Sequence, residues 1–537
     1  MILNYVKKNW YVFSIFLILL VAVFIRFYQL GVIPHGMTWD EAAIGYNGYS
    51  ILHTRRDEWL DKLPVSFMSF GDFKAPLAIY LNGIFTFIFG MNLFAVRVPF
   101  AIGSIFAILG IILLTKEVFR KNKLADYYSL FAGFVLTLSP WHIHYSRAGF
   151  ESGLSLTFTI WAIYLLLKSI NNKFKNIYLL TLSSILFVAS IYTYHSAKVV
   201  VPLIGITFLA LYFKEIKNSI KSLIIPLILF IGGLIPFIND SIFGEGLTRA
   251  GVTIFSSDIS FGQKITYVVK SFLAHTTPDF LLLGNTTTLR HGTGYLGVIF
   301  ITTYLLLSAG IVSLFVNRKK IIDFKQSLFY FLLVIWGILP AAIALEVPHS
   351  NRALLALPGM VITAIFGLNL LIDILKKTKL NLKVSGSYQE KDIIAKSFVG
   401  TLIAVHVIFG VTFLNHYFYQ FSKKSTDAFN DGYLEAFEIA EMYEDGDGVF
   451  PVDKIIFTSK YGQPYIYALF VRETNPIWYR GGSLIKYEFY DKINVSDLSR
   501  KNALVVGSGT DDLPTEKADH IIYGEDGSIR FQIFRTR

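Results

Sequence analysis

Two adjacent carboxylates stand a few residues beyond the first long apolar run of the sequence. Asp40 and Glu41 lie in HGMTWDEAAIGYNGY, residues 35–49, and the apolar run before them covers about residues 10 to 27. A carboxylate within hydrogen-bond reach can accept the proton of a hydroxyl that attacks an electrophile. Neighbouring side chains on a regular element point in different directions. Asp40 is therefore the candidate general base, and Glu41 is predicted to orient the site or contact substrate.

Side chains that could bind an anion follow these acids along the sequence. Lys74 stands shortly before Pro76, and Arg352 lies in EVPHSNRALLALPG, residues 346–359. Fixed cations stabilise the negative charge that grows on a phosphate leaving group. Arginine favours bidentate contact with phosphate, whereas lysine acts as a point charge. The candidate substrate-binding residues are Lys74, Arg97, Arg147, Glu151, Tyr194, His195, Lys198, His349 and Arg352.

Composition places these residues in a membrane protein. The chain has 537 residues, of which 53% are hydrophobic and 16% are charged, and its mean hydropathy is +0.52. A soluble protein carries far less apolar surface. The net charge of +11 is explained by Lys and Arg on cytoplasmic loops, so a nucleic-acid partner is not predicted. With no cysteine, disulfides are excluded, and any outer domain must rely on its own hydrophobic core.

The basic residues decide how many times the chain crosses the membrane. If the apolar runs 77–91 and 93–115 both crossed, Lys116 to Lys123 would lie outside, against the preference of Lys and Arg for the cytoplasm. The run between Pro76 and Asn92 has only 15 residues, fewer than the roughly 20 that a crossing needs. It is predicted to be a helix lying at the outer surface. The remaining runs then give eleven crossings, with the N-terminus in the cytoplasm.

This topology places the candidate residues on the outer face of the membrane. The first outer loop, residues 28–92, carries the acids and Lys74. Lys198 and Arg352 lie in short outer turns, where Lys and Arg are normally depleted. Anion binding at the membrane surface is the predicted cause. Arg97 and Arg147 could instead be structural partners of the outer acids.

A second long outer loop is predicted at residues 239–293. Its Gly, Thr and Asn content indicates irregular structure of the kind that gates or binds substrate. Arg249, Arg290 and His291 could contact a sugar or a phosphate there. A lid without chemistry explains the loop equally well.

The last part of the chain has a different character. Residues 1–416 form the predicted transmembrane module, whereas residues 417–537 carry frequent charges and short apolar runs such as KIIFT, ALVVG and IRFQIF. A helix at about 430–444 precedes these strands. The segment is predicted to be a small α/β domain outside the membrane, and acceptor recognition or packing against the outer loops would both suit it.

The order of these features resembles a known family. WDEAAIGYNGYSIL, then DEWLDKLPVSFMSFGDFKAPLAIYLNGIFTFIFGMNLFAVRVP, then SRAGFES, are similar to segments of membrane glycosyltransferases of the GT-C fold. Within that fold they resemble the bacterial relatives of the protein O-mannosyltransferases and the aminoarabinose transferases. The resemblance covers roughly the first 200 residues and extends by topology to about residue 416.

The resemblance implies a function. Such enzymes move a sugar from a polyprenyl-phosphate donor to an acceptor hydroxyl on the outer side of the membrane, with inversion if one displacement occurs. Asp40 would be the catalytic base, and Lys74 and Arg352 would hold the donor phosphate. The acceptor could be a protein, a glycolipid or a polysaccharide. A multi-pass protein of the bacterial plasma membrane is expected, with the active site and the C-terminal domain outside the cytoplasm.

Metal use is not favoured by the sequence. The related oligosaccharyltransferases combine a first-loop Asp with a D-x-D signature in the second outer loop. Here that loop offers only Glu151, preceded by His142 and His144. Three or four converging ligands would be needed for a divalent ion. The histidines are predicted to lie at the membrane interface instead.

One alternative of another class stays open. A non-enzymatic transporter or flippase of lipid-linked sugars could use the same residues only to bind a headgroup. Transporters usually carry ionisable groups near the membrane midplane, and the predicted spans have almost none. The glycosyltransferase is therefore the preferred prediction.

Overall fold

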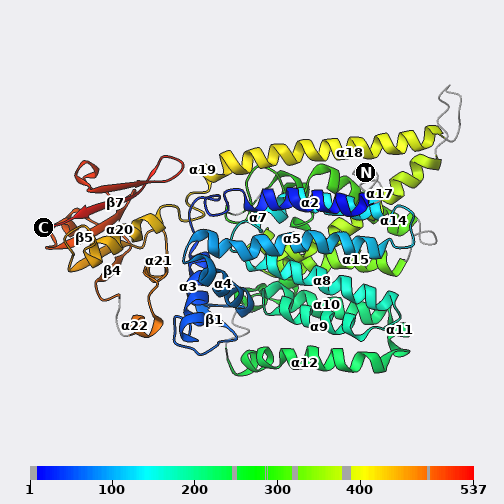
Figure 1. Ribbon diagram of the computed structural model, residues 1–537, viewed down its shortest axis with the longest axis horizontal. Helices are drawn as coiled ribbons and strands as arrows, with labels where there is room; N and C mark the ends of the chain where they lie inside the picture. The colour runs from blue at the N-terminus through cyan, green and yellow to red at the C-terminus, as the bar shows by residue number, and fades with distance from the viewer. Residues whose placement is uncertain are drawn as a thin grey trace.

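The protein is a helical bundle with a small sheet domain at one end (Figure 1). The computed structural model describes residues 9–244, 251–284, 286, 288–316, 324–377, 389–480 and 484–537. The prediction of a mostly helical, multi-pass membrane protein with a small C-terminal α/β domain is confirmed.

The bundle is built from long apolar helices that run roughly parallel to one another (Figure 1). They are α2 (Trp10–Phe27), α5 (Leu93–Val118), α6 (Ala125–Leu138), α8 (Glu151–Asn171), α9 (Ile177–Ile191), α10 (His195–Leu211), α12 (Ile220–Phe243), α14 (Ile301–Val316), α15 (Phe324–Ala342), α17 (Leu357–Lys377) and α18 (Gln389–His416). Within the described ranges, seven helical segments are long and apolar enough to span a membrane, and α6, α9, α10 and α14 are shorter apolar helices. Eleven crossings thus stay a prediction.

Two further helices lie at one end of the bundle, beside the C-terminal domain (Figure 1). They are α3 (Trp39–Thr54) and α4 (Pro76–Phe89), the apolar segment that is too short to cross. The two backbones are in close contact, because a Cβ atom on Gly48 would lie 2.6 Å from the Gly83 nitrogen. This end, which carries Asp40 on α3, is called the site end below.

The opposite end of the bundle carries the predicted cytoplasmic connections. The short helix α11 (Phe213–Lys217) lies there (Figure 1). Helices α5, α8 and α10 also end on basic connections, with lysines at 116–123, 168–175 and 214–221. Acids at one end and basic loops at the other are the arrangement that the positive-inside rule predicts for a site on the outer face.

The prediction of an irregular loop at 239–293 is wrong in its middle. Helix α13 (Phe261–Ala274) begins with a capping box in which Ser260 and Gln263 satisfy each other's backbone N–H groups. The short helices η2 (Ile254–Ser256) and η3 (Asp279–Leu283) flank it. Arg249, a predicted ligand contact, lies outside the described residues.

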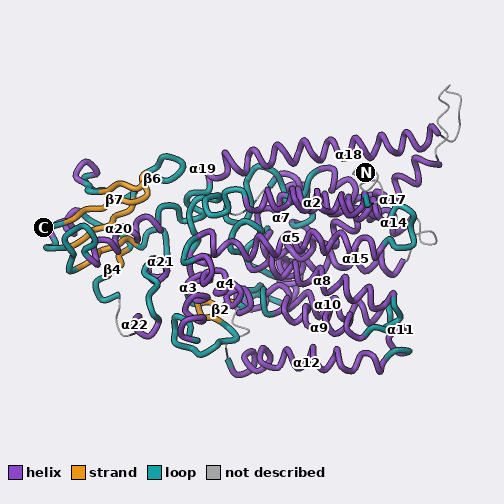
Figure 2. The backbone as a smooth tube through the Cα atoms, viewed as in Figure 1, coloured by secondary structure: helices purple, strands orange, loops and turns teal. Residues whose placement is uncertain are grey.

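The C-terminal domain is a five-stranded sheet with helices packed on it (Figure 2). Its strands are β3 (Lys454–Thr458), β4 (Tyr487–Tyr490), β5 (Ala503–Ser508), β6 (His520–Tyr523) and β7 (Ile529–Arg535), in the order β4-β3-β5-β7-β6. Strands β3, β4 and β5 are parallel, whereas β7 pairs antiparallel with β5 and β6. Its helices are α20 (Tyr433–Asp445), which matches the predicted helix at 430–444, α21 (Pro464–Val471) and α22 (Pro476–Arg480).

The domain has a buried core of its own, and the larger of its two clusters also includes residues from the start of the chain. Met37, Ala42 and Tyr46 at the start of the chain lie in the same buried cluster as Phe457 and Tyr467. The Tyr467 hydroxyl donates to the Met37 carbonyl at 2.7 Å. Helix α3 thus packs on the sheet domain as one of its core elements, and the domain fixes the element that carries the acid pair.

Candidate active site

A helix cap directs the side chains of the two adjacent acids to different surroundings. Thr38 caps α3, and its hydroxyl accepts from the Glu41 N–H at 3.2 Å while Glu41 Oε2 accepts from the Thr38 N–H at 3.0 Å. This capping box turns Glu41 back toward the start of the helix. Asp40 is left in the first turn with a partly exposed carboxylate. The backbone N–H groups of a helix N-terminus stabilise negative charge at that position.

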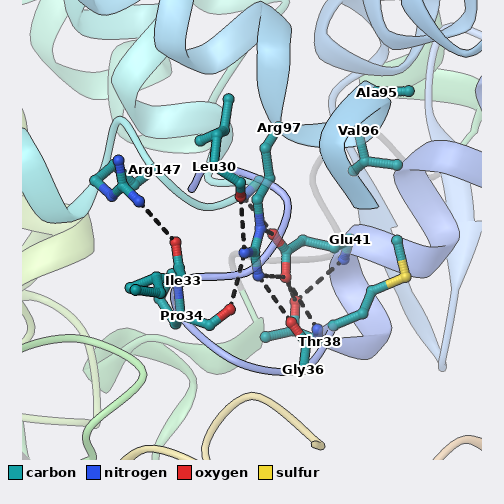
Figure 3. Close-up of polar contacts among 12 residues, drawn as sticks. Leu30, Ile33, Pro34, Gly36, Thr38, Glu41, Ala95, Val96, Arg97 and Arg147 are labelled. Carbon is teal, nitrogen blue, oxygen red and sulfur yellow. Dashed lines mark hydrogen bonds and ion pairs between the residues drawn. The ribbon is translucent and has the colours of Figure 1, made fainter. Parts of the chain in front are cut away.

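Glu41 forms a buried ion pair with Arg97 of α5 (Figure 3). Arg97 Nε donates to Glu41 Oε1 at 2.8 Å, and both side chains are fully buried. Glu41 Oε1 also accepts from the Gly149 N–H at 3.0 Å. A buried carboxylate with this many donors has little freedom to contact substrate. These contacts favour a structural role for Glu41 over the predicted orienting role in catalysis.

Arg97 also holds the segment that leads into α3. Its guanidinium donates to the carbonyls of Leu30, Pro34 and Gly36, at 3.2, 2.9 and 2.8 Å (Figure 3). These carbonyls belong to an irregular connection, so they need donors from elsewhere in the chain. Arg97 is a structural partner of an outer acid, the second of the two roles that its position suggested.

Arg147 acts in the same way on the end of α2. It donates to the carbonyls of Ile25 at 2.7 Å, Tyr28 at 2.7 Å and Ile33 at 3.1 Å. It is completely buried. The last carbonyls of a helix have no partner within that helix. Arg147 supplies donors to them and so joins the end of α2 to the segment that leads into α3.

Asp40 contacts a lysine from a separate element. The hairpin of β1 (Phe67–Ser69) and β2 (Asp72–Lys74) ends at Lys74, whose ammonium donates to Asp40 Oδ1. The lysine side chain is 6% exposed and that of Asp40 is 33% exposed. The carboxylate is therefore the member of the pair that a ligand from solvent can approach, with the cation immediately behind it.

A cavity of about 600 Å³ is lined by four of the predicted substrate-binding residues. Tyr194, His195 and Lys198 enter it from the start of α10, and Arg352 enters it from α16 (Ser350–Ala353). Its other walls are the segment 251–256 and the end of α15. Two cations from different helices in one cavity are the arrangement that a phosphate requires.

His195 joins this cavity to the acid. Its Nε2 donates to the Phe73 carbonyl at 2.9 Å, one residue before Lys74. The Leu77 N–H likewise donates to the Tyr192 carbonyl at 2.9 Å. The start of α10 is thus bonded to the hairpin that presents Lys74 to Asp40. These bonds hold the wall of the cavity next to the element that carries Lys74.

Another wall beside the acid is aromatic and basic. The Arg290 guanidinium lies 4.1 Å from the ring centre of Trp39, the residue before Asp40. Arg290 also donates to the Ala428 carbonyl at 3.0 Å, so it joins this wall to the C-terminal domain. The neighbouring His291 ring lies 4.5 Å from that of His349. Burial lowers the pKa of His291 to about 3, with Arg290 adding to the effect, so His291 is neutral.

Glu151 and the two histidines before it are buried or partly buried at the start of α8 and just before it. Glu151 begins α8 and is partly buried. His142 and His144 are buried, which contradicts their predicted place at the membrane interface. His142 Nδ1 is 3.0 Å from an Arg26 nitrogen, and His144 Nε2 donates to the Arg290 carbonyl at 2.9 Å. In the described ranges, no group of three or more His, Asp or Glu side chains is placed to hold a metal ion.

Two residues with buried or close contacts at this end of the bundle were not indicated by the sequence. Trp39 supports Arg290, and its only sequence signal is its position beside the acid pair. Arg26, in the last turn of α2, donates to the Thr137 carbonyl at 2.6 Å. A single arginine at the end of an apolar run normally reaches the lipid headgroups. Its burial could not be deduced from its surroundings in the chain.

Comparison with known proteins supports the fold. The model of the dolichyl-phosphate-mannose-protein mannosyltransferase family matches residues 73–238. No curated protein sequence matches the chain. ArnT from Cupriavidus metallidurans bound to undecaprenyl phosphate superposes with a TM-score of 0.52 at 12% identity, over 98% of both chains.

A second structure has the same fold. The Archaeoglobus fulgidus oligosaccharyltransferase AglB, in complex with an inhibitory peptide and a dolichol-phosphate, superposes with a TM-score of 0.53 at 14% identity. The match covers 98% of this chain and 74% of AglB. The predicted resemblance to GT-C membrane glycosyltransferases of the ArnT and protein mannosyltransferase type is confirmed. At these identities the superpositions establish the fold alone.

Proposed function

We propose that this protein transfers a sugar from a polyprenyl-phosphate donor to an acceptor hydroxyl at the site end of the bundle. The observation that carries the proposal is the contact between Asp40 and Lys74, beside a cavity that holds Lys198 and Arg352. The proposed reaction needs a proton acceptor and cations for the phosphate. Asp40 supplies the first, and Lys74, Lys198 and Arg352 supply the second. The structures of ArnT and AglB with bound polyprenyl phosphates support the choice of donor.

The reaction balances with the side chains present. The acceptor oxygen attacks the anomeric carbon while the bond from that carbon to the phosphate oxygen breaks. The acceptor proton passes to Asp40, and the leaving group is the polyprenyl phosphate with one more negative charge. One displacement inverts the anomeric configuration, and no carboxylate nucleophile is needed.

Each cation has a separate task in this scheme. Lys74 lies against the base before the donor binds, and it can stabilise charge on the bridging phosphate oxygen when the donor is in place. Arg352 and Lys198 face the same cavity and would hold the other phosphate oxygens. Their attraction for phosphate would position the anomeric carbon next to Asp40.

The orientation of the membrane module belongs to the proposal. The basic connections lie opposite Asp40, which is consistent with a cytoplasmic N-terminus and an acceptor on the outer side of a bacterial plasma membrane. The acceptor is a hydroxyl of a protein, a glycolipid or a polysaccharide. AglB has been solved with an acceptor peptide, which supports a protein acceptor.

The test is transfer of label from a panel of polyprenyl-phosphate sugars in membranes that contain the protein and its natural acceptors. Asp40→Asn keeps the size and hydrogen bonding of the side chain but removes the base, so we expect about 10²- to 10⁴-fold less transfer. The matched control is Asp61→Asn, an exposed acid in the same segment. Donor retention by both variants is measured separately.

The outcomes separate the enzyme from the transporter. Equal transfer by wild type and Asp40→Asn would show that Asp40 is not the base. Movement of labelled donor across the bilayer without covalent transfer, at the same rate in both proteins, would favour the flippase.

A further inference from the structure

A groove of about 720 Å³ opens on the side of the bundle between α2, α6 and α18. Its lining is almost wholly apolar, and it is separate from the cavity that holds Lys198 and Arg352. Figure 1 shows α18 running along the edge of the bundle next to α2. Helix α18 approaches α6 closely at Gly410, where an added Cβ would lie 3.0 Å from Leu138.

The groove occupies only the half of the bundle next to the site end. It begins at Leu17 of α2 and ends at Tyr28, the residue after that helix, and on the other side it runs from Val407 of α18 to Tyr419, just beyond the end of α18. Helical segments of twelve and thirteen residues rise about 17 Å. The hydrocarbon core of a bilayer is about 30 Å thick, so this depth is close to that of one leaflet.

The chemistry of α18 changes in steps along the groove. Val407, Val411 and Asn415 of α18 line it in this order toward the site end, and Tyr419 of the π-helical turn η5 (Tyr417–Phe421) follows them. Lys423 lies about one turn beyond Tyr419 and is exposed in α19 (Ser422–Lys424), which follows η5 directly. Lys424, beside it, is exposed as well.

This series matches the profile of a phospholipid. Valines would contact an acyl chain, the amide and the phenol would lie at the depth of the glycerol esters, and the lysines would lie at the depth of the phosphate. Tyr28 and Phe418 close the polar end of the groove, with ring centres 5.2 Å apart. Arg147 supports Phe418 from behind, with its guanidinium 4.8 Å from the ring centre.

We propose that this groove binds one anionic glycerophospholipid of the leaflet at the site end, with an acyl chain between α2, α6 and α18 and its phosphate at Lys423 and Lys424. The one-leaflet depth fits an acyl chain better than the longer polyprenyl chain of a donor. Through Arg147 the lipid would stiffen the connection between α2 and α3. The proposal does not depend on the transferase reaction.

The experiment uses the delipidated full-length protein and native mass spectrometry, with dioleoyl phosphatidylglycerol or dioleoyl phosphatidylcholine as the probe. We expect one phosphatidylglycerol to bind at least tenfold more tightly than phosphatidylcholine. Lys423→Gln/Lys424→Gln should remove this preference, since each lysine near a lipid surface is worth about fivefold in affinity. Lys460→Gln/Lys501→Gln, two exposed lysines of the C-terminal domain, should not.

A second pair of variants tests the groove itself. Val411→Trp would fill it and should abolish the binding of one lipid, whereas Ile408→Trp lies on the same helix, is exposed and does not line the groove. The melting temperatures of both variants show that they are folded. Equal binding of both lipids by wild type, or unchanged binding in Val411→Trp, would overturn the proposal. The proposal would also be overturned if undecaprenyl phosphate displaced the phospholipid from wild type but did not bind to Val411→Trp, because the groove would then be a polyprenyl site.

Discussion

The ammonium of Lys74 lies against the carboxylate of Asp40, although the two residues reach each other from a hairpin and from the first turn of α3. The pair combines the two charges that the proposed reaction needs, one for the proton and one for the phosphate. Its geometry is set by the hairpin, because Lys74 is the last residue of β2.

Lys74→Met should therefore reduce transfer more than donor binding. We expect kcat to fall about 100-fold, since a cation that stabilises the leaving group acts mainly in the transition state. Lys74→Arg should restore part of the rate, because it keeps the charge. The measurement is initial transfer rate against donor concentration. A rise in KM with unchanged kcat would place Lys74 in ground-state binding only.

Glu41→Gln should destabilise the folded protein, whereas Asp40→Asn should leave its stability unchanged. Removing one member of a buried ion pair costs about 3 to 5 kcal/mol, because its partner stays buried and charged. Glu41 and Arg97 form such a pair, but Asp40 is partly exposed. Thermal unfolding of both variants in detergent checks this expectation. A melting temperature for Glu41→Gln equal to that of wild type, with loss of transfer, would restore Glu41 as a catalytic candidate.

Sequence periodicity and charge were enough to predict the helical bundle. Helix α4 was recognised because 15 residues between Pro76 and Asn92 are too few for a crossing. Helix α13 was missed because Gly, Thr and Asn dominate the residues on both sides of it. Its capping box, Ser260 with Gln263, was the local signal that could have indicated it.

The site was predicted less completely than the fold. Lys198 and Arg352 break the charge rule for the turns that were predicted to be outer, and the structure brings both into one cavity. The burial of Glu41, Arg97 and Arg147 depends on contacts between distant segments, which no local pattern carries. For the same reason no local pattern indicated that α3 packs into one of the core clusters of the C-terminal domain.

The C-terminal domain should be necessary for the geometry of Asp40. Phe470→Ala opens a cavity where α21 packs on Gly45 of α3, and a Phe-to-Ala change in a core costs about 3 to 5 kcal/mol. We expect a lower melting temperature and a parallel loss of transfer. Phe450→Ala, at an exposed position of the same domain, is the control. Retained transfer by a destabilised Phe470→Ala protein would show that the domain is not needed to position the acid.

Arg352 and Lys198 should act on the donor together. Arg352→Met and Lys198→Met should each raise KM for the donor about tenfold, because each removes one of the two cations that face the same cavity. The double variant should lose less than the product of the single effects if both hold one phosphate. A double-mutant cycle on kcat/KM measures this coupling. Strict additivity would mean that the two residues contact different groups.

Stability should fall as pH rises through neutrality because of Glu58. Burial raises the pKa of this carboxyl to about 7, although Asn47 and Ser69 donate to it, both at 3.3 Å. In the unfolded chain the pKa is near 4.3. Between these two pKa values the folded state binds the proton and the unfolded state does not. The contribution of Glu58 to the free energy of unfolding is therefore fully present below about pH 4 and is lost as pH rises through 7.

Glu58→Gln should remove this dependence, because the amide stays neutral at every pH. We expect its melting temperature to exceed that of wild type by an amount that grows from pH 5 to pH 8. The free-energy difference at pH 8 should be on the order of 3 to 4 kcal/mol. Glu435→Gln, an exposed acid on α20, should show no such trend. Parallel melting curves for wild type and Glu58→Gln across this range would mean that Glu58 is ionised in the folded protein, with its charge stabilised by the donors around it.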